Sequence, residues 1–323
     1  MALVLVLCIG LTFPGEKPIV YGDDGQEMQL PAAFHKWTTH RDTLRLVSVY
    51  GILACGMTVV IITAGIDLSV GSVLGLTAVC FPLLLMYFHW PPVLAVCGTL
   101  AIGTVCGLVS GGITAVFRIQ PFIVTLAMMV FARGLAKAVT GGKKAPLYIQ
   151  SEDGTIHYPP VVQAIRTRWF DDNLAVVTVV FLISALITWI LLSRLRWGRY
   201  LYAIGGNEQA ARLSGVPVAA SKILAYALAG LFSAVAGICQ AAQETNGDPE
   251  AGATYELTAI AIVVIGGTNL MGGSGGIGLT VLGALTIGYI QKILSINQVP
   301  EAWRLMLTGI IIVAAVLVQR RRA

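Results

Sequence analysis

Long apolar runs recur along the sequence, and they limit what this chain can fold into more than any other feature. A helix needs about 20 mostly apolar residues to cross a hydrocarbon core that is roughly 30 Å thick. Inside lipid, backbone polar groups must bond to one another, which a helix achieves within a single segment. The sequence therefore predicts an all-α, polytopic membrane helical bundle of about ten transmembrane helices, forming one domain over residues 1–323. The expected spans are 1–13, 46–64, 68–88, 93–117, 120–140, 173–193, 222–243, 255–269, 277–294 and 303–319.

The composition agrees with a membrane protein and favours neither a metal centre nor a disulfide framework. Hydrophobic residues make up 56% of the chain and charged residues 11%, whereas soluble domains carry about 25% charged residues. All six cysteines lie in apolar runs without CxxC spacing, so we expect them to be small buried hydrophobes. No two of the four histidines have the i,i+4 spacing of a helical metal site, and no metal is expected.

The distribution of charge predicts how the chain crosses the membrane. Two polar connections, 14–45 and 141–172, contain both charge signs, whereas the connection 194–222 and the C-terminus, Arg320–Arg322, are basic. Lysine and arginine accumulate on the cytoplasmic side of membrane proteins. We therefore expect 194–222 and the C-terminus to be cytoplasmic, with 14–45 and 141–172 outside. The run 1–13 lacks the basic start and the cleavage site of a secretory signal and is interpreted as the first span.

An acid interrupts the apolar runs at Asp67, and the stretch around it is partly repeated. The sequence GIDLSVGS (65–72) corresponds at five of eight positions to GTNLMGGS (267–274), which places Asn269 opposite Asp67. Each copy lies where one apolar run stops and the next begins, as in transporters with interrupted helices. An acid near membrane depth is costly and is usually retained for function or pairing. The simpler interpretation is that Asp67 and Asn269 are N-caps of the following helices; the alternative adds that they line a polar cavity.

The basic connection 194–222 contains signals for a short displayed helix. A Gly-Gly break at 205–206 precedes Asn207, which is a favoured N-cap residue, and the helical pattern EQAARLS follows it. Gly215 and Pro217 then end the helix. The residues alone leave two interpretations open, which are a docking element on the cytoplasmic face and an ordinary amphipathic connector.

A family resemblance favours the docking element. The stretches that carry it are GMTVVIITAGIDLSVGS (56–72), RIQPFIVTLAMMVFARG (118–134), GRYLYAIGGNEQAARLSGV (198–216) and AIAIVVIGGTNLMGGSGG (259–276). Together they resemble the ribose-type permease subunits of bacterial carbohydrate ABC importers, which are multi-pass proteins of the inner membrane. The resemblance implies a second permease copy or paralogue, two copies of an ATPase subunit and an extracytoplasmic sugar-binding protein. It places the coupling contact with the ATPase at Gly205, Gly206, Asn207, Glu208, Ala211, Arg212, Ser214 and Gly215.

The chain has no G-x-x-x-x-G-K-[ST] phosphate loop of its own. We therefore expect a transport subunit without enzymatic activity or a bound cofactor, with ATP and Mg²⁺ used by the partner ATPase. An uncharged sugar would be held by many modest hydrogen bonds, so hydroxyl and amide side chains are the candidates for the substrate pathway. They are Asp67, Ser69, Ser72, Gln120, Thr125, Asn269 and Ser274.

Two other classes of protein compete with this hypothesis. A secondary transporter or channel driven by an ion gradient would use intramembrane charges, such as Asp67 with Lys292 or Arg133, as a relay. An intramembrane serine protease could use Ser274 but would need a histidine on another span as general base. All four histidines lie outside the interiors of the expected spans, which disfavours the protease.

Overall fold

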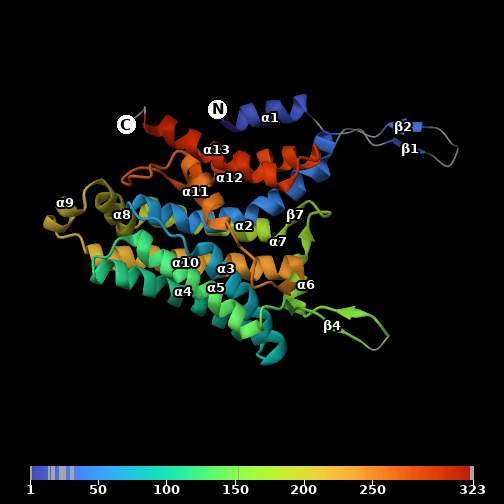
Figure 1. Ribbon diagram of the computed structural model, residues 1–323, viewed down its shortest axis with the longest axis horizontal. Helices are drawn as coiled ribbons and strands as arrows, with labels where there is room; N and C mark the ends of the chain where they lie inside the picture. The colour runs from blue at the N-terminus through green and yellow to red at the C-terminus, as the bar shows by residue number, and fades with distance from the viewer. Residues whose placement is uncertain are drawn as a thin grey trace.

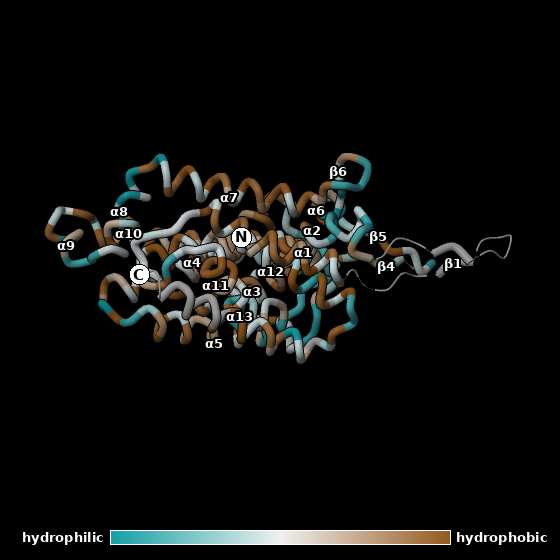
Figure 2. The backbone as a smooth tube through the Cα atoms, turned by 90° about the horizontal axis from the view of Figure 1, so that it is seen from above, coloured by the Kyte–Doolittle hydropathy of each residue, from teal (hydrophilic) through white to brown (hydrophobic). Residues whose placement is uncertain are grey.

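The computed structural model describes residues 2–13, 15, 19–21, 27–29, 33–151 and 153–320. Most helices run along the longest axis of the molecule, with a short helix, α9, at one end and small β-hairpins at the other (Figure 1). Figure 2 shows that apolar residues dominate the long helices, whereas polar residues gather in the connections at the two ends. The described chain therefore has the outline of a membrane bundle with two polar ends.

Ten apolar helices correspond to the ten predicted spans. Their bounds are α1 (Ala2–Thr12), α2 (Trp37–Ile62), α3 (Val70–Pro82) with a π-helical turn η2 (Leu83–Tyr87), α4 (Pro92–Val116), α5 (Pro121–Thr140), α7 (Val176–Arg194), α10 (Val218–Glu244), α11 (Tyr255–Gly266), α12 (Ile277–Ile296) and α13 (Glu301–Arg320). Seven of the described helices are long and apolar enough to cross a membrane, and shorter apolar helices accompany them. The predicted helical membrane bundle is confirmed.

Helix α2 begins at Trp37, earlier than the predicted span start at residue 46. An ion pair and a hydrogen bond stabilise its polar first turns, because Asp42 accepts from Arg168 at 2.9 Å and Arg41 donates to the backbone carbonyl of Asp172 at 3.0 Å. Hydropathy marks only the apolar part of a helix, and these partners lie far away in sequence. Several residues of the connection 14–45, together with Arg321 and Arg322, lie outside the described residues.

The remaining elements are short. Helix α6 (Pro160–Arg166) and the 3₁₀ turn η1 (Ala33–His35) lie near the hairpin end, and α8 (Arg196–Gly206) and α9 (Glu208–Leu213) lie at the other end (Figure 1). Each described strand pairs with one antiparallel partner. The pairs are β1 (Ile19–Tyr21) with β2 (Glu27–Gln29), β3 (Ala145–Pro146) with β8 (Asn246–Gly247), β4 (Ile149–Gln150) with β5 (Ile156–His157), and β6 (Arg168–Trp169) with β7 (Leu174–Ala175).

Helix α10 is the central packing element, because α2, α3 and α4 all pack along it. Small residues bring the backbones close together at these crossings. A Cβ atom on Gly56 would lie 2.7 Å from the Cα of Ala229, and one on Gly103 would lie 2.6 Å from the Cβ of Ala234. Close approach of this kind supplies van der Waals contact where lipid provides no hydrophobic drive for helix association.

Candidate translocation and coupling site

Two non-helical joints interrupt the bundle at the positions of the sequence repeat. The first joint, 63–69, links α2 to α3, and the second joint, 267–276, links α11 to α12. Each joint has a residue of positive φ close to the end of the preceding helix. This residue is Ala64 (58°) in the first joint and Gly267 (109°) in the second. A left-handed residue at this place is a common helix terminator, and it costs glycine less than alanine.

The repeated acid and amide make the same local turn. The Oδ1 atom of Asp67 accepts the backbone N–H of Ser69 at 2.8 Å, and the Oδ1 atom of Asn269 accepts that of Met271 at 3.0 Å. This i to i+2 bond is the Asx turn that aspartate and asparagine form in place of a helix. The sequence repeat is thus also a repeat of local structure.

The expectation that these two residues are helix N-caps is wrong. Ser69 occupies the N-cap position of α3, and Gly276 occupies that of α12. The side-chain oxygens of Asp67 and Asn269 are already bonded to backbone N–H groups before either helix begins. An Asx turn and an N-cap use the same acceptor, so the local turn prevails over capping.

The polar side chains of the first joint are enclosed by protein. Asp67 is 1% exposed, and its Oδ1 atom also accepts the Ser69 hydroxyl at 2.6 Å. Thr125 on α5 donates from Oγ1 to the carbonyl of Ile66 at 3.3 Å. The hydroxyl of Tyr226, on α10, is buried beside this joint and has no hydrogen-bond partner among the described residues. The joint is therefore a buried polar site at the contact of α3, α5 and α10.

The seven predicted pathway residues do not form one continuous lining. Asp67, Ser69 and Thr125 gather at the first joint, and Ser72 lies in the first turn of α3. Gln120 is exposed at the start of α5, Asn269 is partly exposed, and Ser274 is exposed on the second joint. The two joints face different surroundings, which no local pattern in the sequence revealed.

A cavity of about 400 Å³ lies between α3, α5 and the segment that precedes α11. Its polar side chains are those of Ser72, Arg133, Lys137, Thr254 and Glu256. Arg133 donates to the carbonyl oxygens of Pro249 at 2.6 Å and Ala251 at 2.7 Å, and so fixes this segment against α5. Sequence reasoning did not include Thr254 or Glu256 among the site residues. The available signal was the run 244–256, which contains Glu244, Asp248, Glu250 and Glu256 and no lysine or arginine.

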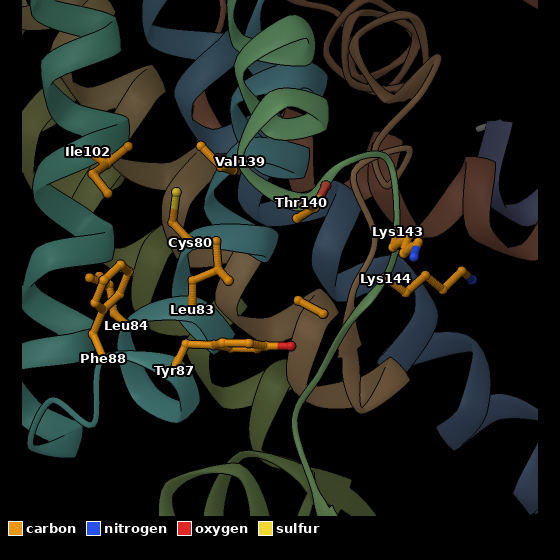
Figure 3. Close-up of a pocket in the computed structure, with 11 residues that line it drawn as sticks. Cys80, Leu83, Leu84, Tyr87, Phe88, Ile102, Val139, Thr140, Lys143 and Lys144 are labelled. Carbon is orange, nitrogen blue, oxygen red and sulfur yellow. The ribbon is translucent and has the colours of Figure 1, made fainter.

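A second cavity, of about 800 Å³, lies beside η2 and is mostly apolar. Figure 3 shows Leu83, Tyr87 and Ile102 on its walls, with Lys143 and Lys144 on the segment that follows α5. Lys144 pairs with Asp248 at 2.8 Å. None of the predicted pathway residues lines this cavity. Among the described residues, no group of three His, Cys, Asp or Glu side chains could hold a metal ion.

The segment 205–215 forms the short helix that the sequence predicts. Asn207 is the N-cap of α9, because its Oδ1 atom accepts the N–H of Ala210 at 2.9 Å. The helix ends at Leu213, and Gly215 follows with a φ of 80° before Pro217. These N-cap and C-terminal predictions are confirmed. Helix α9 projects from the end of the bundle opposite the hairpins (Figures 1 and 2).

Charge pairing fixes α9 to the start of α10. Glu208 accepts from Lys222 at 2.6 Å and from Arg212 at 2.9 Å. Partial burial raises the pKa of Glu208, but the hydrogen bonds and charges of Lys222 and Arg212 together hold that pKa below its ordinary value. Ala211 is buried against Ile204, whereas the side chain of Leu213 is 85% exposed. Leu213 was not among the predicted contact residues, although an apolar side chain presented at a helix tip suits a docking contact.

The segment 205–215 lies against the backbone of the second joint and of the end of α2, which leads into the first joint. The N–H of Gly273, in the second joint, donates to the carbonyl of Ile62 at the end of α2 at 3.0 Å. A Cβ atom on Gly205 would collide with both of these groups. The hydroxyl of Tyr202, on α8, donates to the carbonyl of Gly275 at 2.9 Å. A displacement of α8 and α9 would therefore act directly on the second joint and on the helix that enters the first.

An apolar helical bundle with two interrupted helix pairs and a short helix displayed at one end defines a polytopic membrane permease. The model of the family described as branched-chain amino acid transport system / permease component matches residues 41–316. The chain belongs to this permease family and is a multi-pass protein of the bacterial inner membrane.

Several curated relatives carry names of sugar permeases. The ribose import permease of Escherichia coli (strain K12) is 40% identical over 283 residues, which is 86% of this chain and 84% of that protein. The ribose import permease of Bacillus subtilis (strain 168) is 39% identical over 280 residues, which is 87% and 84% of the two chains. The fructose import permease of Rhizobium meliloti is 33% identical over 285 residues, or 86% and 76%. No solved structure matches the chain.

Proposed function

We propose that this chain is the transmembrane permease subunit of an ATP-binding-cassette importer that moves a monosaccharide or a related sugar across the inner membrane. The similarity to ribose and fructose import permeases over more than four-fifths of the chain supports a sugar as the substrate. The name of the family model mentions amino acids, so the sugar assignment depends on the relatives and not on the family description.

The single observation that carries the mechanism is the contact of the segment 205–215 with the second joint and with the end of α2, which enters the first joint. An ATPase dimer that closes on ATP would push on α9, and the ion pairs of Glu208 would pass that motion to α10. Gly205 lies against Ile62 and Gly273, so the same motion reaches both joints. The helices joined there would then alternate between outward-open and inward-open arrangements. ATP and Mg²⁺ would be bound by the ATPase and not by this chain.

The partners follow from the same proposal. A second permease copy or paralogue would complete the pathway, two ATPase subunits would bind at the α9 end, and a sugar-binding protein would deliver substrate at the hairpin end. In the pathway, the buried hydroxyls at the first joint and the cavity beside Ser72 would offer hydrogen bonds to sugar hydroxyls. The Tyr226 hydroxyl, buried without a described partner, is a further candidate donor.

The geometry gives little support to an ion-driven relay through Asp67. Arg133 is engaged with two backbone carbonyls, and Lys292 lines a different cavity at the hairpin end. The described hydrogen bonds of Asp67 come from Ser69. Serine protease chemistry at Ser274 is equally disfavoured, since His40 bonds to Tyr289 and lies at the end of the bundle that carries the hairpins.

Reconstitution tests the proposal. The chain would be placed in proteoliposomes with the ATPase and the sugar-binding protein that co-purify with it, and uptake of labelled ribose, xylose and fructose would be measured. Uptake should require ATP and should persist when ion gradients are collapsed. Uptake driven by an ion gradient without ATP would contradict the proposal.

Two variants locate the coupling contact. Replacing Glu208 and Arg212 together by alanine, or making Leu213→Ser, should reduce ATP-driven uptake at least about tenfold, which corresponds to a loss of roughly 1.4 kcal/mol of coupling. Phe117→Ser is the matched control, because Phe117 is an exposed apolar residue (70%) at the end of α4, which lies beside the start of α10 and outside both α9 and the two joints. Normal uptake in both α9 variants would show that α9 is not the coupling contact.

A further inference from the structure

A polar cavity of about 460 Å³ lies at the end of the bundle opposite α9. The ends of α2, α10, α12 and α13 form it, and Arg168 of β6 closes one side. The positively charged side chains that line it are Arg45, Arg168, Lys292 and Arg304, and Asp42 is its one acidic side chain. The cavity is separate from both joints and from the cavity beside Ser72.

The described contacts leave most of this positive charge without a carboxylate. Asp42 is engaged with Arg168 at 2.9 Å, and Arg45 donates from Nε to the Gln243 side-chain oxygen at 3.2 Å. Among the described residues, no ion pair is made by Arg45, Lys292 or Arg304. Three cations therefore share one concave site whose described carboxylate, that of Asp42, is paired with Arg168, and gathering like charges is unfavourable unless further negative charge joins them.

The polar atoms in the cavity are also mostly donors. The Nε atom of Arg304 and the Nε2 atom of Gln243 are buried and have no acceptor among the described residues. Buried donors of this kind are rare in native structures and usually bond to something. The missing partner must accept several hydrogen bonds and carry negative charge. A neutral sugar does not meet the second requirement, whereas a phosphate group meets both.

We propose that this cavity binds a phosphate-bearing anion. Arginine matches phosphate because its planar guanidinium offers two parallel donors to two oxygens, and lysine adds a compact charge. The volume is large compared with the roughly 30 Å³ of a water molecule, so a phosphate with its ester substituents fits. The cavity lies at helix ends, where lipid headgroups meet a membrane protein, and clustered lysine and arginine side chains attract anionic headgroups. An anionic phospholipid is therefore the favoured source, and free phosphate is the other.

The bound anion would tie α13 to α2 and α12, which already pack closely at this end, where Gly288 lies against Val47. Arg45 is on α2, Lys292 on α12 and Arg304 on α13, so one phosphate between them would replace mutual repulsion by shared attraction. Removing the ligand should then loosen the hairpin end of the bundle without affecting α9.

Thermal unfolding of the delipidated protein in a neutral detergent tests this. Phosphatidylglycerol added at about 100 times its dissociation constant should raise the Tm of the wild-type protein by about 5 °C, and phosphatidylcholine should not. The double variant Arg304→Gln/Lys292→Gln should lose more than half of that rise. Lys143→Gln is the matched control, because Lys143 is an exposed lysine near the same end that lies outside this cavity, and it should keep the full rise.

Further experiments distinguish an anionic lipid from free phosphate and control for a folding defect in the variants. A rise with inorganic phosphate alone, lost in the double variant, would support the anion site with a soluble ion as its occupant. The charge-conserving variant Arg304→Lys/Lys292→Arg should fold and retain phosphatidylglycerol, counted by native mass spectrometry. Equal effects of the two lipids, or a double variant that retains phosphatidylglycerol but no longer binds the sugar-binding protein, would overturn the proposal.

Discussion

The two joints have the same local turn but lie in opposite surroundings. In the first joint Asp67 is 1% exposed and bonds both the N–H and the hydroxyl of Ser69. In the second, Asn269 is partly exposed and its side-chain oxygen bonds the N–H of Met271. Ala64 and Gly272 bring the joints into direct contact. Similar stretches of sequence thus form a buried polar site around Asp67 and a partly exposed turn around Asn269 beside it.

The difference shows how the same Asx turn serves two purposes. A carboxylate inside a bundle is costly unless hydrogen bonds compensate it, and Ser69 supplies two of them. The neutral amide suits the second joint, because its backbone must also contact Ile62 and Gly205 without bringing a charge into that contact. We infer that the first joint is specialised for solute and the second for transmission. Four predictions test this comparison.

Gly205→Ala should have the largest effect. Its Cβ would collide with the carbonyl of Ile62 and the N–H of Gly273, neither of which is a flexible side chain. Overpacking of this kind costs about 3 kcal/mol, and ATP-driven uptake should fall at least about tenfold. Thermal unfolding and uptake assays measure the two effects.

The adjacent glycine provides the control. A Cβ on Gly206 would meet nothing within 4 Å, so Gly206→Ala should change stability by less than about 1 kcal/mol. If both variants lost stability and uptake equally, the loss would come from any substitution at this end of α8 and not from the contact of Gly205 with the second joint.

Asp67→Ala and Asn269→Ala compare the joints directly. Removing the Asp67 carboxylate leaves a buried N–H and a buried hydroxyl of Ser69 without an acceptor, which should cost about 2 kcal/mol of stability. Removing the amide of Asn269 leaves an N–H that water can reach, and the cost should stay below about 1 kcal/mol. The measurement is the free energy of unfolding in detergent. A larger loss for Asn269→Ala would reverse the assignment of buried and exposed joints.

Tyr202→Phe removes the hydroxyl that donates to the Gly275 carbonyl. This single hydrogen bond should contribute about 1 kcal/mol, so stability should fall slightly and uptake by about two- to fivefold. Hydrogen exchange should increase in the second joint and stay unchanged in the first. Increased exchange at residues 63–69 would show that the two joints open together.

The pH response of α9 should be the smallest effect. Because the pKa of Glu208 is lowered from its ordinary value of 4.5, its ion pairs are fully formed above pH 4.5 and are lost as pH falls below that value. Hydrogen exchange at 207–215 should therefore be flat from pH 8 to about 5, after correction for intrinsic rates, and rise below about 4.5. In Glu208→Gln the rise with acid should disappear. An increase in hydrogen exchange at 207–215 near neutral pH would contradict the lowered pKa of Glu208.

Much of this fold follows from the apolar pattern. Ten apolar helices appear where the ten runs predict them, since only helices satisfy their backbones within lipid. The short helix α9 was also predictable, because Asn207 and Gly215 act through local hydrogen bonds and dihedral angles. The early start of α2 was missed, because Arg168 and Asp172, which stabilise its polar turns, lie more than 120 residues away.

The sequence alone determined which segments are helical and where they break, because these depend on residues close together in the chain. Only the structure decided that both breaks form an Asx turn, and that Asp67 is buried whereas Asn269 is partly exposed. It also decided that Arg133 and Glu256 line one cavity, and that Gly205 lies against Ile62 and Gly273. Burial and contact between distant segments depend on how whole helices pack, and that information is spread over every interface in the bundle.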